Sequence, residues 1–186
     1  MAEAPQLSEE CKAAIIADTE SAYATWKAGC TEEQKAAAHA MMERYNAEPA
    51  FKAEKMTQVN QMFTDADTNG DGILDRSEWG VFHQKSNEMK VAEGNYVDDR
   101  ADREQTKYAV LNLINPAQEG VTMADIRQSM VAAHPRWEEL RIADGLWVAC
   151  SSNMEGYLSN HFPVDLDLPK SLVPWCASTA TLPNNL

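Results

Sequence analysis

Apolar residues recur every three or four positions along much of the chain, which is the spacing of helices with one buried face. The first such segment places Cys11, Ile15, Ala22 and Trp26 on one side. Ser8 precedes this segment and is followed by two acidic residues, a pattern typical of a helix N-terminus. We therefore predict a first helix that begins just after Ser8.

Two more helices are predicted before residue 67. A capping box, in which Thr31 and Gln34 each accept the other's backbone N–H, begins the second helix. It continues through an alanine-rich segment to Tyr45. The third helix is predicted to begin at about Pro49, and its apolar face carries Met56, Val59, Met62 and Phe63.

The helical pattern continues in the second half of the chain. Trp79, Phe82 and Met89 line one side of a helix that is predicted to end before Gly94. Residues 97–114 are predicted to be helical as well. Two opposite-charge pairs four residues apart support that helix, namely Asp99–Arg103 and Arg100–Glu104.

Later start signals indicate further helices and then a tail. Thr122 is a predicted N-cap, and Pro135 is predicted to begin another helix. From Phe162 onward four prolines and no helical period predict an extended or irregular tail. Because no convincing β-strand pattern is present, the predicted fold class is all-α.

The overall charge limits the partners that the chain can bind. Its 29 acidic residues outnumber its 16 basic residues, for a formal net charge of −13. Nucleic acids and anionic membranes need a basic surface, so neither is an expected partner. An acidic chain is suited to collecting cations.

The termini and cysteines predict a reduced cytoplasmic protein. The acidic start lacks the basic and apolar regions of a signal peptide, and no segment approaches the ~18 apolar residues of a membrane span. The four cysteines are widely separated and are expected to be free thiols rather than a disulfide pair. They are Cys11, Cys30, Cys150 and Cys176.

Residues 67–78, "DTNGDGILDRSE", concentrate negative charge at a regular spacing. Carboxylates held so close together disfavour joint ionisation unless a cation compensates them. A twelve-residue loop around calcium supplies side-chain oxygens at positions 1, 3, 5, 9 and 12 and a carbonyl oxygen at position 7. The predicted metal ligands are therefore Asp67, Asn69, Asp71, the Ile73 carbonyl, Asp75 and Glu78.

Two further positions agree with this ligand assignment. Gly72 stands at position 6, where the chain turns with a positive φ, and Leu74 at position 8 can point into the core. A reading that starts at Asp65 would place Arg76 at position 12, where a guanidinium cannot ligate a cation. This pattern resembles the EF-hand superfamily, with a calmodulin-like or sarcoplasmic calcium-binding-protein-like layout.

The resemblance implies paired helix–loop–helix units, and two weaker copies are found. Residues 115–125 resemble the same loop shortened by one residue, and residues 151–162 resemble one that lacks its last ligand. Their starts lie 36 residues apart, close to the spacing within an EF-hand pair. Four units in two lobes are therefore expected, with residues 1–94 as the amino-terminal lobe, 95–163 as the carboxy-terminal lobe and 164–186 as the tail.

The expected function is that of a calcium-binding protein with one intact site, acting as a sensor or adaptor for a protein target. Magnesium is a possible competitor, and nine methionines suit either an adaptable target groove or core filling. The alternatives are a structural or cytoskeleton-associated scaffold tuned by calcium, and a calcium buffer. No catalytic motif is present, so an enzyme is not expected, although EF-hand photoproteins of similar length hold an oxidisable luciferin.

The tail carries an apolar set that is costly to leave in water. It is therefore predicted to fold back as a strap over the carboxy-terminal lobe, the alternative being a tail that stays free for a partner. These residues are Val164, Leu166, Leu168, Leu172, Val173 and Trp175.

Overall fold

The structure is a computed structural model that describes residues 6–144 of the 186-residue chain. Within that range the chain forms six helices and no strand longer than a single bridge, which confirms the all-α prediction for these residues. The helices are α1 (Glu9–Gly29), α2 (Glu32–Ala47), α3 (Pro49–Ala66), α4 (Arg76–Ala92), α5 (Arg103–Asn112) and α6 (Met123–Ala143).

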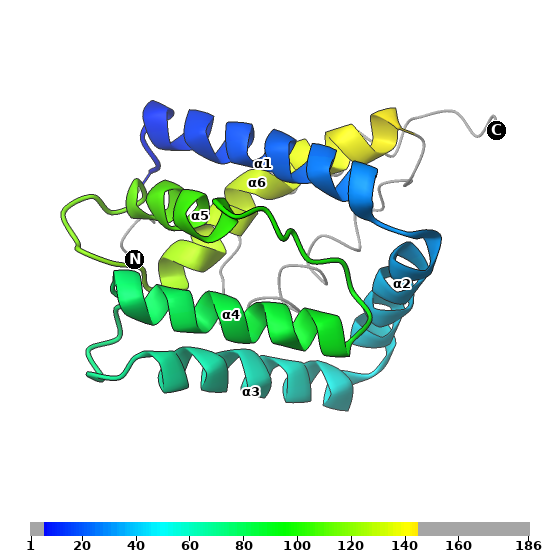
Figure 1. Cartoon of the computed structure of the whole chain (residues 1–186), viewed down its shortest axis with the longest axis horizontal. Coiled ribbons are helices and arrows are strands. Elements are labelled where there is room, and N and C mark those ends of the chain that lie inside the picture. Colours follow the sequence, from blue (N-terminus) through cyan, green and yellow to red (C-terminus); the bar gives the residue numbers. More distant parts are fainter. Residues whose placement is uncertain (1–5, 145–186) are drawn as a thin grey trace.

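The helices are arranged in two packed pairs with two shorter helices beside them (Figure 1). Helix α1 packs along α6, and α3 packs along α4. Helix α2 connects α1 to α3 and packs against α3. Helix α5 contacts α1, α4 and α6. None of these helices is long and apolar enough to cross a membrane, within the residues that the structure describes.

Local capping signals predicted the starts of the first three helices correctly. The Ser8 side chain accepts the backbone N–H of Cys11 at 3.1 Å. Thr31 and Gln34 form the complete capping box at the start of α2. Pro49 is the first residue of α3, where its missing N–H leaves no hydrogen bond unmade.

Helix α5 is shorter than predicted, because it begins at Arg103 rather than near residue 97. The two predicted ion pairs within it, Asp99–Arg103 and Arg100–Glu104, are also wrong. Both arginines form ion pairs with Asp98 instead. Asp98 Oδ2 lies 2.6 Å from Arg100 Nη2 and 3.3 Å from Arg103 Nε. These contacts hold the segment before α5 in a non-helical course.

Helix α6 does not begin at Pro135, which lies inside it. A proline within a helix removes one backbone hydrogen bond and costs about 3 kcal/mol. Packing against α1 and α5 offsets this cost, since Ala132 and Ala133 pack on the cluster formed by Cys11, Ile15 and Val110. Tertiary burial thus outweighs the local signal.

The main core joins segments that the predicted boundary after residue 94 would separate. Its buried members come from α3, the loop 67–75, α4, α5 and the segment before α6. They are Phe63, Ala66, Leu74, Trp79, Phe82, Leu111 and Val121. Loop 67–78 therefore pairs with residues 115–125, through Leu74 and Val121, and not with the join between α1 and α2.

Two of the predicted features lie outside the described residues: the copy of the loop at residues 151–162 and the tail at residues 164–186. Cys11 and Cys30, the two cysteines inside the described range, are both buried free thiols.

Candidate metal centre

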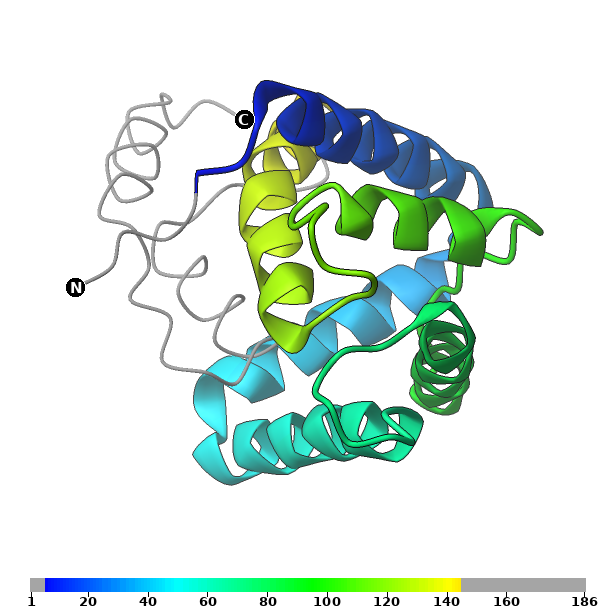
Figure 2. The ribbon, with the colours of Figure 1, turned by 90° about the vertical axis from the view of Figure 1, so that its left-hand side faces the viewer.

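The acidic loop links the end of α3 at Ala66 to the start of α4 at Arg76, and it lies beside the loop between α5 and α6 (Figure 2). Gly72, the predicted turning residue, has φ +80, a value that L side chains rarely adopt. A Cβ there would meet nothing within 4 Å, so the requirement for glycine is one of backbone conformation alone.

Asp67 organises the first half of the loop. Its Oδ1 accepts the backbone N–H of Gly70 at 2.9 Å and of Asp71 at 3.2 Å, and its Oδ2 accepts that of Gly72 at 2.8 Å. Three donors on one carboxylate wrap the backbone around this side chain. The loop is thereby folded around the first predicted ligand.

The next predicted ligands each hold a neighbouring backbone N–H. Asn69 Oδ1 accepts from Asp71 N at 2.9 Å, and Asp71 Oδ1 accepts from Ile73 N at 2.8 Å. Asp75 Oδ1 accepts from Ser77 N at 2.8 Å and from Glu78 N, so Asp75 is also the N-cap of α4. Oδ2 of Asp71 and Oδ2 of Asp75 accept no hydrogen bond within the described residues.

Glu78, the predicted last ligand, closes the loop onto its own start. Its Oε1 accepts the Thr68 backbone N–H at 2.9 Å and the Thr68 hydroxyl at 2.7 Å, while its Oε2 accepts Asp75 N at 3.1 Å. Glu78 is only 5% exposed. The hydrogen bond from the Thr68 hydroxyl, together with those from the backbone, holds the pKa of Glu78 below its ordinary value, so the side chain stays ionised.

This arrangement brings the six predicted ligands into one loop but does not point them at one centre. Nowhere between residues 6 and 144 do three or more His, Cys, Asp or Glu side chains converge as they would to hold a metal ion. The carboxylates of loop 67–78 do not converge because each of them accepts hydrogen bonds from backbone N–H groups of the loop. The donor set itself is suited to a hard cation, because oxygens of Asp71 and Asp75 and the Ile73 carbonyl remain available. Glu78 would have to exchange its hydrogen bonds to ligate.

The loop is tied to residues 115–125 by a two-residue antiparallel bridge. Leu74 N donates to Val121 O at 2.8 Å, and Val121 N donates to Leu74 O at 2.9 Å. Both side chains are fully buried. The prediction that Leu74 points into the core is therefore confirmed, and Val121 is the residue that pairs with it.

The helix that leaves the loop is anchored to α5 by contacts that the sequence did not predict. Trp79 Nε1 donates to the backbone carbonyl of Glu104 at 3.1 Å. The Glu104 carboxylate accepts hydrogen bonds from both Nη atoms of Arg76. Trp79 directly follows Glu78 and is 4% exposed. Movement of Glu78 would thus reach α5 through Trp79.

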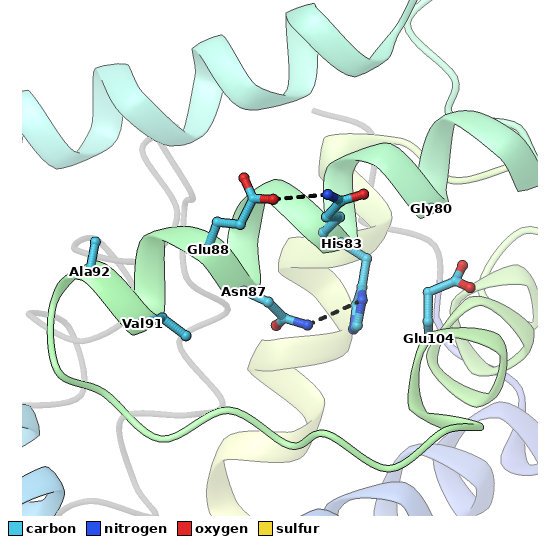
Figure 3. A pocket seen from close by; sticks show the side chains of 8 residues that line it. Gly80, His83, Asn87, Glu88, Val91, Ala92 and Glu104 are labelled. Atoms are coloured by element: carbon cyan, nitrogen blue, oxygen red, sulfur yellow. Dashed lines mark hydrogen bonds between the residues drawn. The ribbon is translucent and has the colours of Figure 1, made fainter.

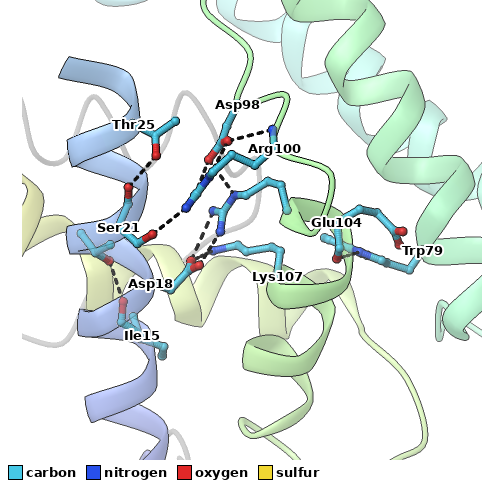
Figure 4. A network of polar contacts seen from close by, with 11 residues as sticks. Ile15, Asp18, Ser21, Thr25, Trp79, Asp98, Arg100, Glu104 and Lys107 are labelled. Carbon is cyan, nitrogen blue, oxygen red and sulfur yellow. Dashed lines mark hydrogen bonds and ion pairs between the residues drawn. The ribbon is translucent and has the colours of Figure 1, made fainter. Parts of the chain in front are cut away.

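A second polar network joins α5 to α1 (Figure 4). Asp18 is 8% exposed and pairs with the Arg103 guanidinium and, at 3.4 Å, with Lys107 Nζ. Burial raises the pKa of Asp18, but the hydrogen bond from Arg103 and the charges of Lys107 and Arg103 outweigh burial, so the pKa is lowered. No sequence signal could find this pair, because Asp18 and Arg103 are 85 residues apart.

A shallow hollow with a volume of about 600 Å³ lies along α4, away from the loop (Figure 3). His83 and Asn87 meet there at 3.4 Å, and Glu104 borders the opposite side. Burial lowers the pKa of His83, which therefore favours its neutral form.

Comparison with known proteins finds no protein-family model, curated protein or solved structure that matches this chain.

Proposed function

We propose that the chain is an EF-hand-type protein that binds one calcium ion in loop 67–78. The ligands would be the side chains of the four acidic residues, the Asn69 side chain and the Ile73 carbonyl. The observation that carries this proposal is the folded loop itself, in which Asp67 holds three successive turn N–H groups and Gly72 has positive φ. Such a loop needs only local side-chain rotation to offer six oxygens.

The pairing of two helix-flanked loops supports the same proposal. The resemblance implies loops that meet through short strands, and the Leu74–Val121 bridge has this form. The second loop offers no comparable ligand set, so a stoichiometry of one is expected from the described residues. Magnesium, which demands a more rigid octahedral geometry, is expected to bind the same loop more weakly than calcium.

The function beyond binding is proposed to be that of a calcium sensor or adaptor for a protein target. Cation ligation by Glu78 would release Thr68 and shift the start of α4, where Trp79 contacts α5. Two large apolar side chains are already exposed on α4, with Val81 at 42% and Val91 at 66%. A change in this helix would therefore alter an apolar surface that a target could contact.

Tryptophan fluorescence tests this coupling most simply. Calcium should change the emission of the wild-type protein and increase its binding of an apolar dye, with half-saturation at about 10⁻⁷–10⁻⁵ M. Trp79→Phe should remove most of the emission change, and Glu78→Gln should remove both responses. Glu119→Gln, which neutralises an exposed carboxylate in the neighbouring loop, is the matched control and should respond as wild type.

Two outcomes would contradict the sensor proposal. If calcium binds without changing emission or dye binding, the protein is a buffer or a scaffold rather than a sensor. If Glu78→Gln responds like the wild type, the signal does not come from loop 67–78.

A further inference from the structure

The loop between α5 and α6 is closed around the side-chain amide of Gln118. Its Nε2 donates to the Gly120 carbonyl at 3.3 Å and to Asp125 Oδ2 at 3.1 Å. Both partners can only accept, so the group between them must be the NH₂ of the amide. One amide nitrogen therefore bridges a backbone carbonyl and a carboxylate.

These two acceptors occupy the places of two predicted metal ligands in the intact loop. Gly120 immediately precedes Val121, as Ile73 precedes Leu74, and the two loops are paired at those residues. Asp125 follows Val121 by four residues, as Glu78 follows Leu74. The amide thus contacts the equivalents of the position 7 carbonyl and of the position 12 carboxylate.

The remaining contacts complete the closure of the loop. Asp125 Oδ2 also accepts the Thr122 backbone N–H and hydroxyl, both at 2.8 Å. Asn112 Oδ1 accepts Gly120 N at 3.2 Å, so the end of α5 is included. Asp125 is 7% exposed, and a carboxylate this buried needs several donors.

The closed loop is in direct contact with the acidic one. A Cβ on Gly120 would lie 2.5 Å from Ile73 Cγ2 and 2.7 Å from the Leu74 carbonyl oxygen. The Gly120 backbone therefore packs tightly on the two residues that follow Gly72. Whatever fixes Gly120 also fixes the second half of the acidic loop.

We propose that the Gln118 amide takes the place of a bound cation in loop 115–125. This loop then keeps one shape with or without calcium, and through Val121 it holds Leu74 and the Ile73 carbonyl in position. The statement that the acidic loop is thereby prepared for calcium rests on the proposed function. The replacement of a cation by Gln118 draws on the predicted ligand positions of that loop, but it is tested in loop 115–125 alone.

The test uses the full chain carrying Glu78→Gln, so that cation binding in the acidic loop is removed. To this parent either Gln118→Met or Gln118→Glu is added. The methionine keeps the length of the side chain without a donor, and the glutamate keeps its shape but replaces the donor by a charged acceptor. The readout is amide hydrogen exchange at Leu74 and Val121, whose N–H groups form the bridge.

In chelator, both variants should exchange these two amides about tenfold faster than the parent, since buried acceptors lose their donor. Millimolar calcium should restore slow exchange in Gln118→Glu, where a cation can bridge three oxygen acceptors, but not in Gln118→Met. Gln105→Glu makes the same charge change at an exposed position of α5 and should exchange as the parent in both conditions. If a variant unfolds in chelator, the same rescue is measured by circular dichroism.

The proposal is overturned if Gln118→Met retains the slow exchange of the parent, because the amide would then be dispensable. It is also overturned if calcium fails to restore Gln118→Glu, since the position would then not be one that a cation can fill. Failure of calcium to bind loop 67–78 in the wild-type chain would overturn the proposed function and leave these exchange results unaffected.

Discussion

At the scale of single residues, the structure relies on buried carboxylates that are fully provided with donors. Asp18, Glu78 and Asp125 are each less than 9% exposed, and each accepts hydrogen bonds from more than one donor. A buried charge is tolerated only when it is paired or hydrogen-bonded. Removing one of these carboxylates should therefore cost more than removing an exposed one.

Asp18→Asn should lower the free energy of unfolding by about 3 kcal/mol at neutral pH, because Lys107 would lose its carboxylate partner and Arg103 would keep only Asp98. The measurement is urea unfolding of both proteins. Asp65→Asn is the matched control, since Asp65 pairs with Lys85 at the surface, and its unfolding midpoint should stay at the wild-type value. Equal midpoints for wild type and Asp18→Asn would show that the buried pair contributes nothing.

The same residue predicts a pH dependence. The pKa of Asp18 is lower in the folded protein than its ordinary value of 3.8, so the folded state favours the ionised form. The stabilisation is therefore complete above about pH 4 and is lost as pH falls through the lower, folded-state pKa. The difference in unfolding free energy between wild type and Asp18→Asn should shrink with acid over that range, as followed by urea titrations from neutral pH downward. A constant difference would contradict this assignment.

At the scale of elements, local signals predicted several helix starts correctly and failed where tertiary packing outweighs them. The capping box at Thr31, the helix start at Pro49 and the loop glycine at Gly72 follow from neighbours within a few residues, and the structure agrees. The true start of α5 and the continuity of α6 through Pro135 depend on packing against α1. No short stretch of sequence contains that information.

The candidate site divides in the same way. Its six ligand positions could be assigned from spacing alone, because all of them lie in one twelve-residue loop. The sequence also predicted that Val121 takes the place of Leu74 in the shortened copy. That the two residues pair directly was not predicted, since the spacing between copies favoured another partner for each loop.

Gly120→Ala tests the contact between the two loops. The alanine would combine a positive φ of 138 with a Cβ only 2.5 Å from the Ile73 side chain. The backbone penalty is about 1–2 kcal/mol, and overpacking adds about 1–3 kcal/mol. Gly94→Ala also places an alanine at a positive φ, here 71, but with open space around it, so thermal unfolding should show a clearly larger loss for Gly120→Ala. Equal losses would indicate that the loops do not pack closely.

At the scale of the whole molecule, the contacts form a chain that runs from the acidic loop to the first helix. Loop 67–75 leads into α4, α4 contacts α5 through Trp79 and Glu104, and α5 is held to α1 by Asp18. The core also combines residues of α3, loop 67–75, α4, α5 and the start of α6. A ligand in the loop should consequently stabilise the described fold as a unit.

Calcium at about a hundredfold excess over its Kd should raise the free energy of unfolding by about 2.7 kcal/mol, provided the unfolded chain does not bind it. Urea unfolding with calcium and with chelator measures this difference. Glu78→Gln should show no difference between the two conditions. A calcium effect of the same size in Glu78→Gln would place the stabilising ion elsewhere.

The central claim is that one calcium ion binds in loop 67–78, and isothermal titration calorimetry of the full chain tests it most directly. The account predicts a stoichiometry of one for wild type and for Glu119→Gln, weaker binding of magnesium, and no binding to Glu78→Gln or Asp67→Ala at the same calcium concentrations. The account is contradicted if wild type releases or absorbs no heat at millimolar calcium, or if Glu78→Gln keeps a stoichiometry of one.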